Sequence, residues 1–133
     1  MKLDKIDQMS EVMRALYDRE FRLIAGILSE ESALRAKLNQ LDMQITANQD
    51  VKTNSHALNA VGAQIVWQAW TSRTKRQLNG ELAQVMAKKL VAMDRVRVAF
   101  GRQRAVEMMM ETKRKDLRKR RAKQRENNLL SLG

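Results

Sequence analysis

The first third of the chain follows one spacing rule without a break. Steps of three and four residues in alternation lead from Leu3 to Ile45, and ten of the thirteen positions reached are apolar. They are Leu3, Ile6, Ser10, Met13, Tyr17, Glu20, Ile24, Ile27, Glu31, Leu34, Leu38, Leu41 and Ile45. Residues at this spacing share one face of an α-helix and form the core of coiled coils. The spacing predicts a long helix packed along one face against another helix.

The composition favours helices over every other kind of structure. None of the 133 residues is proline and only 5 are glycine, so the strongest helix breakers are missing or rare. Aromatic residues make up 4% of the chain, too few for a broad globular core. We expect an all-α protein whose long helices pack in pairs.

A polar stretch interrupts the helical pattern after Ile45. The residues "TANQDVKTNSH" at 46–56 are types that favour turns and caps. They predict one antiparallel coiled-coil hairpin domain, with helix 1 at about 3–48, a turn at about 49–56 and helix 2 at about 57–124. Asn54 or Ser55 is the expected N-cap of helix 2. Residues 125–133 are expected to form a flexible tail.

Helix 2 is expected to pack through an apolar stripe with a polar gap at Thr71–Gln77. The stripe comprises Leu58, Val61, Ile65, Leu78, Leu82, Val85, Met86, Leu90, Met93, Val96 and Phe100. A reversal of the chain near residue 54 would pair Leu3 with Ala105, Leu41 with Trp67 and Leu38 with Trp70. Everything after Met108 would then extend beyond helix 1 as a helical overhang.

The inventory of reactive residues excludes most enzymes. His56 is the single histidine and there is no cysteine, so no metal-ligand set can be assembled from these residue types. The glycines are too far apart for a phosphate-binding loop, and Glu30 with Glu31 is interpreted as solvated surface rather than a catalytic pair. We expect a non-enzyme without cofactor or metal. The sequence has no long apolar run or signal peptide, which predicts a soluble, cytoplasmic protein without a transmembrane segment.

Positive charge gathers towards the C-terminus. Residues 1–50 carry a net charge of −2 and residues 95–133 a net charge of +9, and nine of the thirteen residues from Lys113 to Arg125 are Lys or Arg. This pattern suits an acidic partner such as a protein surface or nucleic acid, although a merely solvated helix end has the same composition. No aromatic residue follows Phe100, which disfavours stacking on bases. "MMM" at 108–110 is either the end of the interhelical core or an adaptable apolar surface.

Both tryptophans lie in one stretch, "VWQAWTSRTKRQ" at 66–77. A two-helix core has little room for two indoles, so we expect one to pack against the other helix and one to face outward beside arginine. Exposed tryptophan beside arginine is typical of binding hot spots. The residues predicted to bind a protein partner are Trp67, Trp70, Arg73, Arg76, Arg102, Arg104, Lys113, Arg114, Arg118, Lys119, Arg120 and Arg121.

The segments "GAQIVWQAWTSRTKRQLNGELAQ" and "RVRVAFGRQRAVEMM" resemble the second helix of the FliJ family. Members of that family are central-stalk components of flagellar type III export, related to injectisome stalks and similar in shape to the γ-subunit coiled coil of rotary ATPases. The resemblance implies that Leu3–Met13 and Arg102–Arg125 face the pore of a hexameric export ATPase. It also implies that Trp67, Trp70 and Arg73 contact the export gate.

Three functions therefore remain open. The first is a stalk or adaptor that couples an export ATPase to the export gate, in the cytoplasm or peripheral to an inner-membrane export apparatus. The second is a basic coiled-coil protein that binds nucleic acid through residues 102–125. The third is an oligomeric coiled-coil scaffold, although the chain is otherwise expected to be a monomer or to self-associate weakly.

Overall fold

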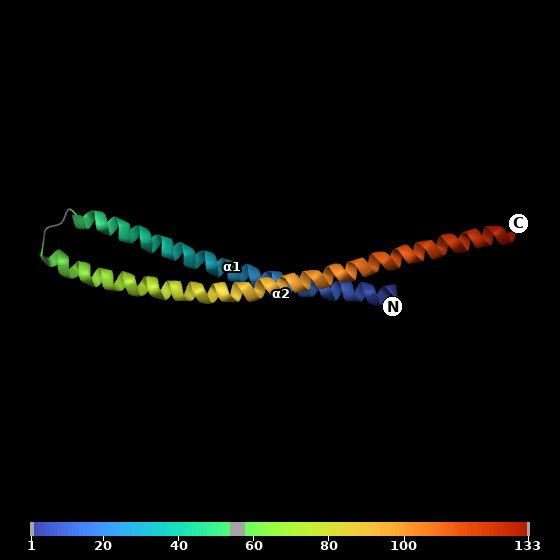
Figure 1. Ribbon diagram of the computed structural model, residues 1–133, viewed down its shortest axis with the longest axis horizontal. Coiled ribbons are helices and arrows are strands. Elements are labelled where there is room, and N and C mark those ends of the chain that lie inside the picture. The colour runs from blue at the N-terminus through green and yellow to red at the C-terminus, as the bar shows by residue number, and fades with distance from the viewer. Residues whose placement is uncertain (1, 54–57, 133) are drawn as a thin grey trace. The chain divides into compact units, whose positions relative to one another are not determined.

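The computed structural model describes the backbone of residues 2–53 and 58–132, and the side chains of residues 2–49 and 61–132. It contains two helices, α1 from Leu3 to Thr53 and α2 from Leu58 to Leu132, with no strand in the described residues. The two helices pack against each other (Figure 1). The prediction of an all-α, two-helix hairpin is confirmed. The expected cap residues Asn54 and Ser55, and His56, lie outside the described residues.

The chain divides into two compact units, and each contains part of both helices. Unit 1 comprises Met1–Leu23 and Met93–Gly133, and unit 2 comprises Ile24–Ala92. Within unit 1, Leu3 lies beside Leu117, and the rings of Tyr17 and Phe100 are 5.7 Å apart. A later residue of α1 thus meets an earlier residue of α2, so the helices run antiparallel. Within unit 2 they are also antiparallel. There, Asn48 donates a hydrogen bond of 3.3 Å to Gln64, while the more N-terminal Glu31 contacts Lys89.

The core of α1 follows the predicted spacing. All thirteen positions from Leu3 to Ile45 are buried or half-buried, and Asn48 continues the series. The buried members include Ile6, Leu34 and Leu41. A seven-residue repeat sustained over this length keeps the same face of the helix towards its partner. The sequence prediction for the packing face of α1 is therefore confirmed.

The core of α2 differs from the apolar stripe predicted for it. Leu78, Leu82, Val85, Met86 and Val96 are buried or half-buried as expected, whereas other members of the stripe are exposed. The exposed members are Val61, Ile65, Leu90, Met93 and Phe100. Their places in the core are taken by smaller or polar residues: Gln64, Thr71, Thr74, Lys89, Ala92, Ala99, Gln103 and Val106. Much of the apolar surface of α2 thus faces away from α1.

The spacing of the core positions also changes within α2. The core positions Thr71, Thr74, Leu78, Leu82 and Val85 are separated by three, four, four and three residues, so one step of four is added to the alternation. Such an insertion shifts the packing face relative to a strict seven-residue repeat. Thr71 is buried, and its hydroxyl donates a hydrogen bond of 3.0 Å to the Gln68 carbonyl oxygen. The expected polar gap is therefore part of the core.

The pairing of the two helices is also displaced from the prediction. Leu3 shares a hollow with Lys113 and Leu117, instead of lying opposite Ala105. Glu31 contacts Lys89, although a reversal near residue 54 would place it opposite Gln77, roughly three helical turns earlier. The overhang of α2 consequently begins after Leu117 and not after Met108.

Both helices continue further than the sequence predicted. α1 runs through the first residues of the expected turn to Thr53, and α2 runs through the expected tail to Leu132. Residues 49–53 and 125–132 contain neither proline nor glycine, so their polar residues, such as Asp50 in the first stretch and Asn127 in the second, weaken a helix without stopping it. Polar composition alone was therefore a poor guide to the helix ends.

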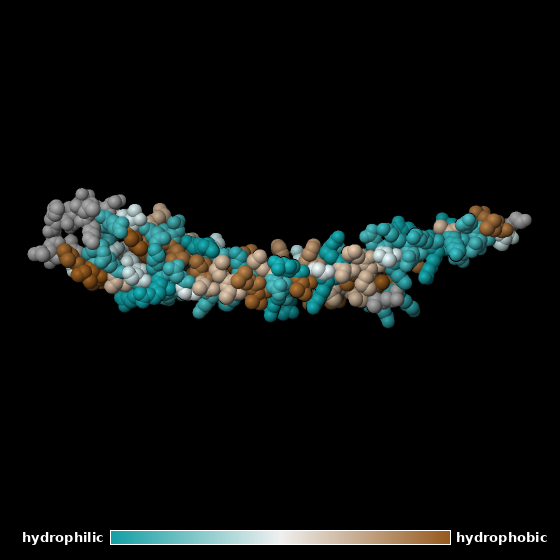
Figure 2. Space-filling view, in the orientation of Figure 1, coloured by the Kyte–Doolittle hydropathy of each residue, from teal (hydrophilic) through white to brown (hydrophobic). Residues whose placement is uncertain are grey.

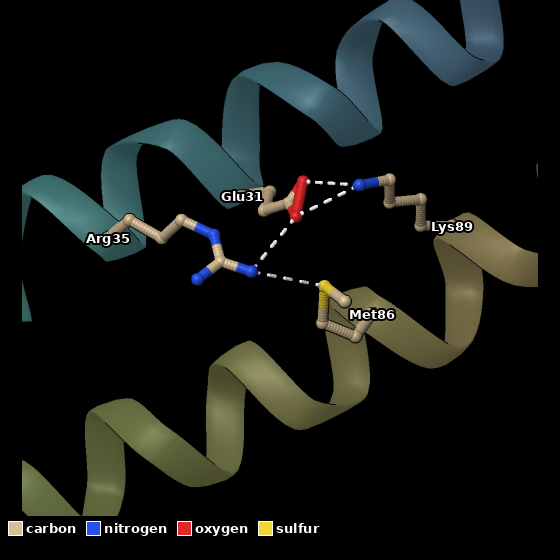
Figure 3. A network of polar contacts seen from close by, with 4 residues as sticks. All are labelled: Glu31, Arg35, Met86 and Lys89. Atoms are coloured by element: carbon tan, nitrogen blue, oxygen red, sulfur yellow. Dashed lines mark hydrogen bonds and ion pairs between the residues drawn. The ribbon is translucent and has the colours of Figure 1, made fainter.

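An ion-pair network centred on the buried Glu31 joins the helices in unit 2 (Figure 3). Glu31 is only 8% exposed, and its two carboxylate oxygens accept hydrogen bonds of 3.1 and 3.0 Å from Lys89 Nζ and one of 3.3 Å from Arg35. Arg35 also donates to the Met86 sulfur at 3.6 Å. The hydrogen bond from Lys89 is the main cause that lowers the pKa of Glu31. The interpretation of Glu31 as solvated surface was wrong, whereas Glu30 is exposed as expected.

The Glu31 network predicts a stability that falls in acid. The pKa of Glu31 is lower in the folded chain than in the unfolded chain, so the ionised carboxylate stabilises the fold. This stabilisation is complete above the unfolded pKa of about 4.3 and disappears as the pH falls through the folded pKa. The thermal midpoint of the parent, measured by circular dichroism, should fall more steeply between about pH 5 and about pH 3 than that of Glu31→Gln. Asp42→Asn, which removes an exposed carboxylate paired with Lys75, is the matched control and should behave like the parent. Equal slopes for the parent and Glu31→Gln would contradict the prediction.

Candidate partner-binding surfaces

The two tryptophans form a stacked pair on α2. Their ring centroids are 5.3 Å apart and the ring planes meet at 26°. Trp67 occupies a core position and is half-buried, whereas Trp70 is 45% exposed. The structure therefore divides their roles as the sequence suggested, with one indole packed and the other outward. The partners Leu38 and Leu41 were expected from a pairing of the helices that the structure displaces, and that part stays a prediction.

The surroundings of Trp70 combine apolar and cationic residues. Val66 is exposed, and so are Arg73 and Arg76, which follow within two turns. Arg73 Nε donates a hydrogen bond of 3.4 Å to the Ala69 carbonyl oxygen, which holds the base of its side chain against the helix. We call Val66, Trp70, Arg73 and Arg76 the tryptophan surface. This set has the aromatic and arginine composition that anchors many protein interfaces.

The last part of α2 is covered by no other segment of its unit. Lys113 and Leu117 are half-buried beside the first residues of α1, and every residue from 118 to 132 is exposed. We call residues 118–132 the basic arm. It carries six Lys or Arg and a single acidic residue, Glu126. None of the ion pairs in the described part of the chain involves the arm.

Only some of the predicted basic residues belong to this arm. Arg118, Lys119, Arg120 and Arg121 lie in it. By contrast, Arg114 is exposed one turn before the arm, Lys113 borders the hollow near Leu3, and Arg104 forms an ion pair of 3.1 Å with Glu107. Arg102 lines a different hollow, with Leu16 and Val98. The predicted set is thus divided among separate places on α2.

The arm ends in apolar residues that were not among the predicted binding residues. Leu129, Leu130 and Leu132 are each more than 70% exposed. Figure 2 shows hydrophilic residues over the C-terminal part of α2 and hydrophobic ones near its end. In the sequence, the signal that could have identified this apolar end is a group of three leucines close to a run of positive charge.

No group of three or more His, Cys, Asp or Glu side chains in 2–49 and 61–132 could hold a metal ion. None of the helical segments that the structure describes is long and apolar enough to cross a membrane. Comparison with protein-family models, curated proteins and solved structures finds no match to this chain. The function is therefore inferred from the chain's own surfaces.

The different environments of the tryptophans predict different effects of their removal. Trp67→Ala should lower the free energy of unfolding by about 2 kcal/mol, because it removes a half-buried indole from the core. Trp70→Ala should cost less than about 1 kcal/mol, because it removes an exposed ring and one stacking contact. Urea denaturation followed by circular dichroism measures both. A larger loss in Trp70→Ala would contradict the assignment of Trp67 to the core.

Proposed function

We propose that this chain is a non-enzymatic stalk or adaptor of a flagellar or type III protein-export apparatus, coupling an export ATPase to the export gate. The proposal rests on the resemblance to FliJ-like stalks and, above all, on the uncovered basic arm. In this role the basic arm binds the ATPase and the tryptophan surface binds the gate. The protein works in the cytoplasm or at the inner-membrane face of the export apparatus.

The arm is suited to entering a partner of opposite charge. A single continuous helix supports it, and within unit 1 it extends past the N-terminal end of α1 (Figure 1). Its fifteen residues span roughly 22 Å at 1.5 Å per residue. Six cations on a helix of this length attract an acidic surface and repel another arm, so the arm favours a partner over a copy of itself.

The leucines at its end favour a protein as that partner. Phosphate contacts would use the cations but leave Leu129, Leu130 and Leu132 in water. An acidic protein pore with an apolar lining would contact both kinds of residue. The tryptophan surface belongs to unit 2 and the arm to unit 1, so the chain offers two separate binding surfaces, as a coupling protein requires.

The arm proposal predicts loss of ATPase binding when the arm is neutralised. Changing Arg118, Lys119, Arg120 and Arg121 to Gln should weaken binding to the export ATPase hexamer at least tenfold, because it removes four of the six cations of the arm. Biolayer interferometry with the purified ATPase and with the gate's cytoplasmic domain measures each affinity. Binding to the gate should change less than twofold.

A matched variant distinguishes the effect of the arm on ATPase binding from the effect of the net charge of the chain. Changing the exposed residues Arg14, Arg22, Lys88 and Arg97 to Gln removes the same number of charges elsewhere, and should leave ATPase binding within about threefold of the parent. If both variants weaken binding equally, the attraction is not specific to the arm. If the parent binds neither the ATPase nor the gate, the proposed function is wrong.

A nucleic-acid-binding protein is the second candidate, because nine of thirteen residues at 113–125 are Lys or Arg. If it is correct, the logarithm of the affinity for duplex DNA or for RNA falls linearly with the logarithm of salt concentration. Neutralising residues 118–121 should then reduce the magnitude of this slope by about 3. Fluorescence anisotropy with labelled 20-mers measures it. Tight binding to the ATPase combined with absent or salt-insensitive binding to the 20-mers would eliminate this candidate.

A further inference from the structure

In unit 1, the two sides of the α1 core face differ in chemical character. On one side, Met9, Leu16 and Leu23 recur every seven residues. On the other side, the same repeat carries Asp7 and Arg14 before it reaches Phe21, whose ring is 6.2 Å from that of Tyr17. Residues seven apart lie on one line along a coiled-coil helix. One flank of α1 is therefore aliphatic at these positions, while the other is charged at Asp7 and Arg14 and aromatic at Phe21.

The apolar flank is hollowed and includes both helices. Met9, Val12 and Met13 line a shallow hollow on α1, and Met13 also lines a second one with Leu16, Val98 and Ala99. Leu16 and Val98 remain 39% and 46% exposed although they lie beside the core. We call Met9, Val12, Met13, Leu16 and Val98 the apolar flank. Exposed apolar residues grouped in this way mark a surface that another molecule covers.

The charges around the second hollow are of both signs. Glu20 and Asp94 line it together with Arg95 and Arg102. None of the four takes part in an ion pair within the described residues. In a two-fold interface the same patch meets itself, so it must carry both signs if its charges are to pair. This patch does, unlike the basic arm, which would repel a second arm.

We propose that the apolar flank binds the apolar flank of a second copy of this chain, forming a two-fold dimer with four helices at the contact. The apolar side chains of the two copies pack at its centre. Glu20 and Asp94 of each copy pair with Arg95 and Arg102 of the other. The dimer does not rest on the export function proposed above, because it forms between copies of the purified chain alone.

The size of the flank sets the strength of the contact. From Lys5, which borders the first hollow, to Leu23 is about 27 Å along α1, and two packed helices are roughly 20 Å wide. The contact then buries on the order of 550 Å² on each copy, at the small end of specific interfaces. The dimer is consequently weak and forms only at high protein concentration.

Sedimentation velocity from about 5 to about 500 µM tests the dimer. The sedimentation coefficient of the parent should rise with concentration, and Leu16→Glu should reduce the association constant at least fivefold, because it places a charge at the centre of the flank. Met43→Glu changes an apolar residue of unit 2 that is 65% exposed, against 39% for Leu16, and should associate as the parent does. Circular dichroism checks that both variants keep the parent's helix content. A parent that stays monomeric at 500 µM, or equal association by Leu16→Glu and the parent, would overturn the proposal.

Two complementary variants test the charge arrangement. Arg95→Glu with Arg102→Glu makes the patch wholly acidic, and Glu20→Arg with Asp94→Arg makes it wholly basic. Each variant alone should remain monomeric, and an equimolar mixture should dimerise at least as strongly as the parent. A mixture that stays monomeric, or either variant dimerising alone as well as the parent, would refute the pairing.

The absence of native cysteine permits a direct test of which flank is in contact. Leu16→Cys places a thiol on the apolar flank, and Asp18→Cys places one on the opposite side of α1. Mild oxidation at 500 µM should link Leu16→Cys into covalent dimers at least five times faster than Asp18→Cys. Equal rates would show that the copies do not meet through the apolar flank.

Discussion

The uninterrupted seven-residue repeat of α1 is the constraint on which the rest of this structure depends. An isolated helix of this kind gains little from propensity alone, so its stability comes from the face that it buries. That face begins at Leu3, and the part of α2 that can pack on it ends at Leu117. Residues 118–132 are helical without a partner helix. The basic arm is thus a direct result of the unequal lengths of the two helices.

The small width of a two-helix core explains why polar residues are tolerated in it. A two-helix core is narrow, and long side chains at its positions reach its edge. Glu31 and Lys89 both occupy core positions, but they satisfy each other across the helices at 3.0 Å. A buried ion pair adds little net stability compared with apolar residues, yet removing one partner leaves the other charge unpaired. The pair therefore favours one alignment of the helices within unit 2.

The sequence predicted α1 well and α2 only in part, for a physical reason. In α1 the apolar residues and the core positions coincide, so spacing alone identified the packing face. In α2 the added step of four residues near Leu78 shifts the face, and small residues such as Ala92 and Ala99 occupy it while Leu90 is exposed. Apolar character was therefore misleading there, because it marks surfaces for other partners as well as the core. The alignment of the helices could not be predicted either, since nothing in residues 46–56 identified the point of reversal.

The candidate surfaces differed in the same way in how far the sequence could predict them. Charge is local in sequence, so the basic arm and the arginines after Trp70 were recognisable as runs. The apolar flank was not, because it combines Leu16 with Val98, which only the pairing of the helices brings to one hollow. The sign of the surrounding charge then distinguishes the kinds of partner. A surface of one sign repels its own copy and selects a different molecule, whereas a patch of mixed sign around an apolar centre can pair with itself. Both kinds occur within unit 1, which allows this helix pair to bind a second copy and a different partner through separate residues.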